Sequence, residues 1–191
     1  MKALILNGGA EADPEMETVH QIVRQELSRA GWDVREFILR NTAIANCLGC
    51  FGCWVKTPGT CVIPDAGREV AKAMIRSDMI VLLTPVTFGG YSSILKKAMD
   101  RIIPLVSPFF VKIHGEVHHK RRYDRYPDLF GVGLLRQEDA ESRALFSTLI
   151  ERNARNFYCR GYSLAITGKD IGKKLETDFS RMLASTEGGK K

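Results

Sequence analysis

The sequence predicts an α/β fold in which a five-stranded, doubly wound parallel sheet is covered by helices on both faces. Five short apolar runs alternate with five segments of helical periodicity, and signals for tight hairpins between strands are almost absent. Parallel strands need long crossover connections, so this alternation is typical of such a sheet. The 191 residues, 45% of them hydrophobic, are enough for one domain with a single core.

The strands of the first half are marked by apolar runs. Residues 3–6 run into an Asn-Gly-Gly turn, which predicts a buried strand that ends sharply. Helical spacing follows, with Gly31 where the helix would stop, and residues 34–39 suggest a second strand. Residues 79–83 are apolar throughout, as in a central strand that is buried on both faces.

The remaining elements follow from periodicity and from Gly, Pro and capping residues. In chain order we expect a helix capped by Asp65, a helix over 94–102 that Pro104 ends, a strand over 129–135, a helix over 145–157 that Gly161 could terminate, a strand over 162–166 and a helix over 175–183.

The domain is expected to span residues 1–185, followed by a disordered tail over 186–191. Residues 104–127 are too long for an ordinary connection between elements of a compact domain. This insertion is therefore expected to be a functional loop or a subunit contact.

Charge and hydropathy exclude several classes of protein. The 28 Lys and Arg residues against 22 Asp and Glu give a net charge of +6, but they are scattered and no nucleic-acid-binding motif is recognisable. The apolar runs fall well short of the roughly 20 residues that cross a bilayer, so no membrane partner is expected. Five cysteines are too few for a disulfide scaffold, and the start lacks a signal peptide, so we expect a cytoplasmic protein.

Four of the five cysteines lie close together, at Cys47, Cys50, Cys53 and Cys61. Their spacing suits a 4Fe-4S cluster, because thiolates two residues apart can reach neighbouring irons. Zinc also accepts four thiolates, although usually from two separated CxxC pairs. The same residues could instead form a redox dithiol, or they could be loop thiols that bind nothing. Cys159 is expected to be a buried core thiol.

In sheets of this kind, ligands bind beyond the carboxyl ends of the strands, near the point where the strand order reverses. This places three loops at one edge, over residues 7–18, 84–93 and 135–139.

Several motifs carry a family resemblance: LILNGG, CLGCFGCW followed by GTCVIPD, IVLLTPVTFGGYSS leading into LKKAMDR, and ERNARNFY. With them, essentially the whole chain resembles the flavodoxin-like NAD(P)H-dependent FMN reductases, close to the iron-sulfur flavoprotein branch. The resemblance implies strand order 2-1-3-4-5, FMN at the carboxyl edge of the sheet, and a homodimer or homotetramer. It also favours a cluster on the four cysteines.

The first loop is the candidate phosphate site. Gly8 and Gly9 allow close approach of the backbone, and Thr18 can offer a hydroxyl. The family's loop usually resembles GSPRxxGNT, whereas this chain reads GGAEADPEMET, with four acidic residues in place of neutral or basic ones. Those acids would repel a phosphate unless they point to solvent.

The second loop is the candidate site for the flavin ring. It can offer N–H donors and small residues to a flat ring at the end of a strand. Its predicted ring-binding residues are Pro85, Val86, Thr87, Phe88, Gly89 and Tyr91.

The basic insertion has three interpretations. It is a solvated excursion, or its arginines bind the 2′-phosphate of NADPH, or Tyr123, Tyr126 and the histidines cover the flavin of a neighbouring subunit.

The sequence therefore predicts an FMN-dependent oxidoreductase that passes electrons from NAD(P)H to a small acceptor such as a quinone or a flavin. No protein acid or base is expected to be catalytic, because the cofactor carries the chemistry. A rival interpretation is an iron-sulfur flavoprotein carrier fed by ferredoxin, and a second is a regulatory protein that has lost its flavin. The acceptor and the choice between NADH and NADPH stay open.

Overall fold

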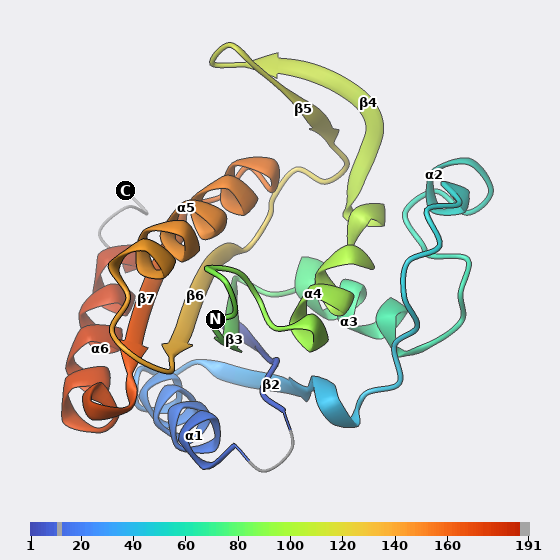
Figure 1. Ribbon diagram of the computed structural model, residues 1–191. Coiled ribbons are helices and arrows are strands. Elements are labelled where there is room, and N and C mark those ends of the chain that lie inside the picture. Colours follow the sequence, from blue (N-terminus) through green and yellow to red (C-terminus); the bar gives the residue numbers. More distant parts are fainter. Residues whose placement is uncertain (11–12, 188–191) are drawn as a thin grey trace.

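The computed structural model describes residues 1–10 and 13–187. Its main sheet holds five parallel strands in the order β2-β1-β3-β6-β7, which confirms the predicted sheet and its 2-1-3-4-5 order (Figure 1). The strands are β1 (Lys2–Asn7), β2 (Asp33–Ile38), β3 (Met79–Pro85), β6 (Asp128–Leu135) and β7 (Gly161–Thr167).

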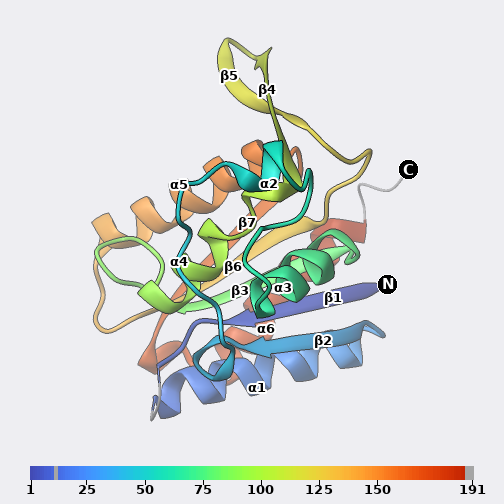
Figure 2. The same cartoon turned by 90° about the vertical axis from the view of Figure 1, so that its right-hand side faces the viewer.

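Helices cover both faces of this sheet, as predicted. On one face lie α1 (Pro14–Arg29) and α6 (Lys173–Glu187), and on the other α3 (Ala66–Ile75), α4 (Ser93–Asp100) and α5 (Ala140–Asn156) (Figure 2). A short helix, α2 (Gly52–Val55), lies in the cysteine segment. Among the residues that the structure describes, no helix is both long and apolar enough to span a membrane.

Two helix ends differ from the expectation. Helix α5 ends at Asn156, so Gly161 does not terminate it but begins β7. The chain instead leaves the helix through Tyr158, whose φ of 55° reverses its direction. Helix α6 continues to Glu187, two residues into the segment expected to be the tail, and 188–191 lie outside the described residues.

The core consists of two apolar layers, one on each face of the sheet. Ile80 and Leu82 of β3 belong to the layer under α3, α4 and α5, while Val81 and Leu83 belong to the layer under α1 and α6. Alternate residues of a strand point to opposite faces, so one continuous apolar run serves both layers. The prediction that this strand is central and doubly buried is confirmed.

The insertion forms a β-hairpin that the sequence analysis did not anticipate. Strands β4 (Val106–Ile113) and β5 (Glu116–Arg121) pair antiparallel and project from the α/β body (Figure 1). Their turn is His114-Gly115, with φ of 48° and 85°. Two positive φ values in a two-residue turn are those of a type I′ hairpin, and Gly supplies one of them without strain.

Candidate functional site

The first two predicted loops meet at the carboxyl edge of the sheet. The N–H of Gly8 donates to the carbonyl of Leu83 at 2.8 Å, and the Ser92 hydroxyl donates to the carbonyl of Gly8 at 2.7 Å. The same Ser92 oxygen caps α4 by accepting from the N–H of Leu95 at 3.2 Å. One serine therefore joins the turn after β1 to the start of α4.

The turn after β1 leaves one buried donor without an acceptor. Asn7 is 1% exposed, and its side-chain oxygen accepts from the N–H of Gly9 at 2.8 Å. Its side-chain nitrogen has no hydrogen-bond partner among the described residues. A buried donor in this state costs stability unless a ligand supplies an acceptor. The turn also needs glycine, because a Cβ on Gly8 would lie 2.6 Å from the Cβ of Leu95.

The side-chain carboxylate of Asp13 caps the N-terminus of α1. Asp13 accepts from the N–H of Met16 at 3.2 Å, and the guanidinium of Arg136 lies 3.9 Å from that carboxylate. Thr18 is exposed, and its hydroxyl donates to the carbonyl of Pro14 at 2.9 Å. Glu11, one of the four acidic residues of this loop, lies outside the described residues.

The second loop is held in place on both sides of its tip. The N–H of Val86 donates to Leu134 of β6 at 2.8 Å, and Thr87 and Gly90 exchange two backbone hydrogen bonds. Phe88 is 98% exposed, with a φ of 49°. No described residue accepts a hydrogen bond from the N–H of Phe88 or Gly89. Phe88 is exposed, whereas Gly89 is buried, so a ligand would have to lie directly on the loop tip to accept from both.

Gly89 lies at the point where this loop packs on α5. Its φ is 72°, and an added Cβ would lie 2.6 Å from the Cβ of Leu145. Both the backbone conformation and the contact therefore require glycine at this position.

Tyr91, another predicted ring-binding residue, turns its side chain toward α5. Its hydroxyl accepts from the side-chain amide of Asn153 at 2.8 Å, and its ring lies edge-on to Phe146. Burial raises the pKa of Tyr91 to about 12, so the phenol stays protonated at neutral pH.

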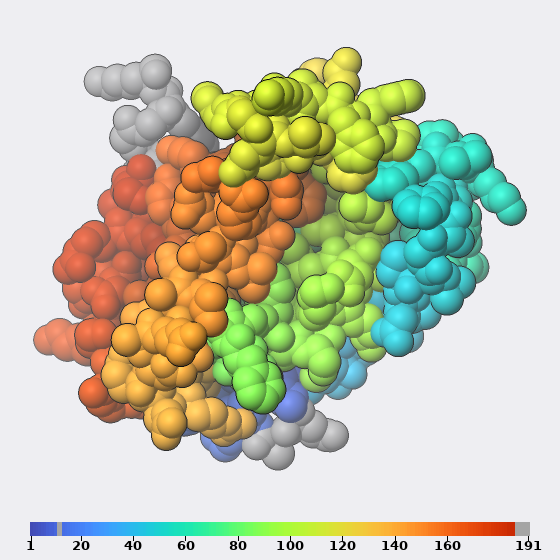
Figure 3. Space-filling model, turned by 45° about the horizontal axis from the view of Figure 1, so that its top comes forward, coloured from blue at the N-terminus to red at the C-terminus, as the bar shows by residue number. Residues whose placement is uncertain are grey.

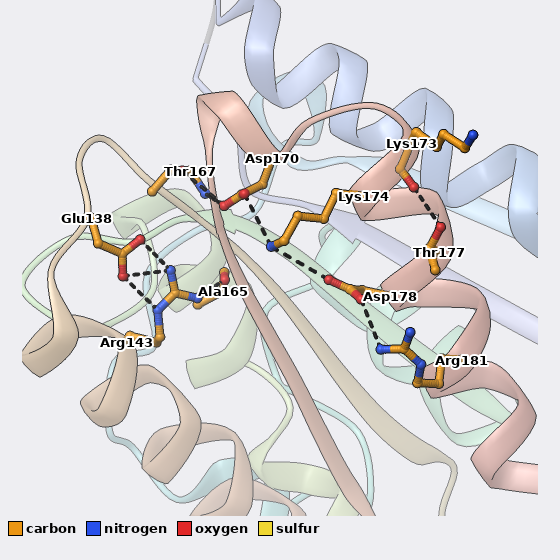
Figure 4. A network of polar contacts seen from close by, with 10 residues as sticks. All are labelled: Glu138, Arg143, Ala165, Thr167, Asp170, Lys173, Lys174, Thr177, Asp178 and Arg181. Atoms are coloured by element: carbon orange, nitrogen blue, oxygen red, sulfur yellow. Dashed lines mark hydrogen bonds and ion pairs between the residues drawn. The ribbon is translucent and has the colours of Figure 1, made fainter.

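The third loop is turned toward the end of β7 by ion pairs (Figure 4). Arg143 of α5 contacts both carboxylate oxygens of Glu138, at 3.0 and 2.8 Å, and also donates to the carbonyl of Ala165. Beyond β7, Lys174 bridges Asp170 and Asp178. These charged side chains hold neighbouring segments to one another, and a cofactor role for this loop stays a prediction.

The four clustered thiols line one cavity of about 430 Å³, together with Phe51, Trp54, Met99 and Arg101. Cys47 and Cys50 are exposed, whereas Cys53 is buried. Burial first, and then the neighbouring thiols, raise the pKa of Cys53, which is opposite to the lowered pKa of a thioredoxin-like nucleophile. Among the described residues, no group of three or more His, Cys, Asp or Glu is placed to hold a metal ion.

The cysteine segment is fastened to the body by Arg101, which follows α4 and is 1% exposed. Its guanidinium contacts both oxygens of Asp65. Its Nε has no hydrogen-bond acceptor within the described part of the chain. The Arg101 side chain also lines the thiol cavity. Sequence reasoning missed this arginine, because nothing in the local pattern marks it as buried.

Most of the basic side chains of the insertion have partners within the chain. Arg122 donates to the carbonyl of Pro104 at 2.9 Å, Arg125 pairs with Asp78, and Arg121 lies over the ring of Tyr158. Binding of a 2′-phosphate by these arginines would have to compete with those contacts, and it stays a prediction.

Two tyrosines and two histidines of the insertion also face inward. Tyr126 is buried and donates to the carbonyl of Leu105 at 2.6 Å, and Tyr123 stacks edge-on to it. The His118 ring lies between Asn156 and Glu116, and the His119 ring contacts Trp54 of the cysteine segment.

Cys159 is half-buried against the core, and burial raises its pKa to about 12.

The strand order, the helices on both faces and the two joined loops define a flavodoxin-like α/β domain. A family model described as NADPH-dependent FMN reductase matches residues 1–120. The chain belongs to this family.

Solved structures share the fold over nearly the whole length. An NAD(P)H:quinone oxidoreductase from Methanothermobacter marburgensis has a TM-score of 0.65 at 12% identity, covering 100% of this chain and 98% of that one. An FMN-dependent NADH-azoreductase from Bacillus anthracis, solved with FMN, has a TM-score of 0.63 at 10% identity, covering 98% and 97%. At such identities the likeness shows the fold alone.

Curated relatives are similar in sequence over about half of their length. An iron-sulfur flavoprotein of Methanocaldococcus jannaschii is 31% identical over 105 residues, which are 55% of this chain and 53% of that protein. An iron-sulfur flavoprotein of Archaeoglobus fulgidus is 29% identical over 101 residues, 53% of this chain and 48% of the relative.

Proposed function

We propose that this protein is an FMN-dependent oxidoreductase that takes electrons from NAD(P)H and passes them to a small acceptor. The observation that carries the proposal is the pair of unpaired N–H groups on Phe88 and Gly89, in a loop that adjoins the turn after β1 at the carboxyl edge of the sheet. Membership of the NADPH-dependent FMN reductase family supports it. Bound FMN would supply the hydride acceptor, and the chain would hold and orient its ring.

The residues at this edge fit such a cofactor. The polar edge of a flavin ring accepts hydrogen bonds, which matches the unpaired N–H groups of Phe88 and Gly89 on a loop held by β6 and α5. The unpartnered amide of Asn7 offers a third donor nearby in the turn after β1. Asp13, Glu15 and Glu17 are unfavourable for a phosphate at the start of α1. The charge of Asp13 faces the amide of Met16 and the guanidinium of Arg136.

A glycine substitution tests where the ring binds. Gly89→Ala should weaken FMN binding about tenfold, because the new Cβ strains the backbone and collides with Leu145. Gly31→Ala is the matched control, since Gly31 has a similar φ of 75° with open space around it, after the end of α1. Quenching of FMN fluorescence on titration gives both affinities. Equal losses in the two variants would contradict placement of the ring on this loop.

A second candidate function is that of an iron-sulfur flavoprotein electron carrier that receives electrons from a ferredoxin. Its support is the gathering of four thiols around one cavity, together with the names of the curated relatives. A single zinc ion would draw four sulfurs to within about 4 Å of one another, because Zn–S bonds are near 2.3 Å. The described residues hold no such close group, and the tandem spacing of Cys47, Cys50 and Cys53 is that of cluster ligands.

Iron and sulfide assays on anaerobically purified protein test this second candidate. A 4Fe-4S cluster requires about four of each per chain. Cys53→Ser should lose most of both, while Cys159→Ser is the control, because Cys159 packs against the core away from the thiol cavity. Absence of iron and sulfide from the parent protein would remove the carrier and leave the flavin oxidoreductase.

A further inference from the structure

A second cavity, of about 450 Å³, lies between α4, α5 and the hairpin (Figure 3). It adjoins the proposed flavin loop through Gly90 and Tyr91. It also shares Met99, Asp100 and Ile103 with the thiol cavity, so it lies between the two proposed redox sites. The residues that close it on the other sides are Ile102, Val106, His119, Leu149, Asn153, Asn156 and Phe157, with Lys96.

The lining favours an uncharged ligand. Most of it is aliphatic or aromatic, and the one full positive charge, on Lys96, pairs with the carboxylate of Asp100 on the same helix. An anionic dinucleotide would find no uncompensated cation in this lining. A flat ring of one or two cycles does fit, because small-molecule sites have volumes of roughly 300 to 1,000 Å³.

Two polar groups of the lining are free to recognise such a ring. The Tyr91 hydroxyl accepts from Asn153, and its own hydrogen has no acceptor among the described residues. His119 Nδ1 lies 2.9 Å from the carbonyl of Ser107. A carbonyl only accepts, so Nδ1 carries the proton, and Nε2 is left as an acceptor without a partner in the described chain. The cavity thus offers one donor and one acceptor.

We propose that this cavity binds the electron acceptor, as an uncharged flat ring that carries carbonyl groups. The proposal rests on the proposed oxidoreductase function. A ring carbonyl accepts from Tyr91, and after reduction the new hydroxyl can donate to His119. Conversion of a ring dicarbonyl to the dihydroxy form takes two electrons and two protons. NADPH supplies two electrons and one proton as a hydride by way of the flavin, and solvent supplies the second proton.

The test is calorimetric titration of the full chain with 2,3-dimethyl-1,4-naphthoquinone, because its substituted ring carbons do not add the exposed thiols of Cys47 and Cys50. Leu149→Trp fills the cavity from α5 and should weaken binding at least tenfold, because the ring loses its space. His119→Phe keeps an aromatic ring between Trp54 and Phe110 but removes the acceptor. Its largest effect is expected on the reduced, dihydroxy form, at about fivefold. Thr148→Trp is the matched control, since Thr148 is exposed on the same helix and does not line the cavity.

The outcomes separate this proposal from the proposed function. Weaker naphthoquinone binding in Leu149→Trp, with Thr148→Trp equal to the parent, supports the cavity whether or not NADPH reduces bound FMN. If NADPH fails to reduce FMN while this pattern holds, the oxidoreductase function falls and the binding site remains. Equal affinity in all variants, or no binding by the parent protein, overturns the proposal. So does a change of oligomeric state in Leu149→Trp without loss of affinity, because the cavity is then a subunit interface.

Discussion

Arg101 and Asp65 form a forked ion pair across thirty-six positions of the chain. The guanidinium donates to both carboxylate oxygens, at 2.8 and 2.7 Å, and donates further to the carbonyl of Ala45 at 2.7 Å. Asp65 in turn caps α3 through the N–H of Gly67 and accepts from the N–H of Ala45. The two ends of the thiol segment are therefore fixed to the end of α4 by one pair of side chains.

Loss of the charge on Asp65 should destabilise the fold strongly. Asp65→Asn keeps a residue that can cap α3 but leaves the buried Arg101 guanidinium without its counter-ion, and breaking a pair of this kind costs about 3 kcal/mol. Urea denaturation measures the change in the free energy of unfolding. Asp100→Asn is the control, because the exposed pair of Asp100 with Lys96 contributes less than about 1 kcal/mol. Similar losses in both variants would contradict this role of Arg101.

The same pair predicts a pH dependence. The hydrogen bonds from Arg101 lower the pKa of Asp65 from 3.8 to about 2, against the opposing effect of burial. Because the pKa is lower in the folded state, the stabilisation is present above the ordinary pKa and disappears as the pH falls through the folded value. The difference in unfolding free energy between the parent and Asp65→Asn should therefore be constant above about pH 5 and shrink between about pH 4 and pH 2. A difference that stays constant to pH 2 would argue against the lowered pKa.

Ser92 should matter far more than its neighbour Ser93. Ser92→Ala removes both the cap of α4 and the hydrogen bond to Gly8, so it should cost about 1 to 2 kcal/mol of stability and weaken FMN binding. Ser93 is exposed, and no such bond joins it to the described residues of the turn after β1, so Ser93→Ala should leave both quantities within error. Thermal unfolding and FMN titration of the two variants decide the matter. Equal behaviour of the two serines would show that the turn and the loop are not coupled.

The cysteines should differ in their rates of alkylation. In the reduced protein at pH 8, iodoacetamide should label the exposed Cys47 and Cys50 first. Labelling of Cys53 and Cys159 should be at least about tenfold slower, because burial hinders access and raises both pKa values, that of Cys159 to about 12. Peptide mass spectrometry gives the rates, and labelling in denaturant is the control in which all five should react alike. Rapid labelling of Cys159 in the native state would be inconsistent with its packing.

The main sheet could be predicted from sequence because its strands are short apolar runs whose burial on two faces leaves a plain pattern, as at residues 79–83. The hairpin could not be seen in the same way, because its strands carry mixed polar and apolar residues and few of their positions are buried. A signal was present nonetheless. His114-Gly115 follows a run rich in β-formers, residues 108–113, and a two-residue turn ending in Gly is typical of a hairpin.

The site was predictable to the extent that it consists of backbone at strand ends. The turn at Gly8 and the loop tip at Gly89 follow directly from glycines after apolar runs. Three other features depend on contacts between residues far apart in sequence. They are the hydrogen bond from Ser92 to Gly8, the buried ion pair of Arg101 with Asp65, and the cavity beside His119. No local pattern encodes them, because each exists only once the crossover connections have brought α4, α5 and the hairpin together.

The most direct test of the central claim is the absorption spectrum of the full chain, incubated with FMN, freed of excess by gel filtration and then exposed to NADPH without oxygen. We expect one bound FMN per chain, with a flavin absorption band at about 450 nm. NADPH should bleach this band by reducing the flavin. A chain that emerges colourless, or one whose bound flavin NADPH leaves unchanged, would contradict the proposed oxidoreductase function.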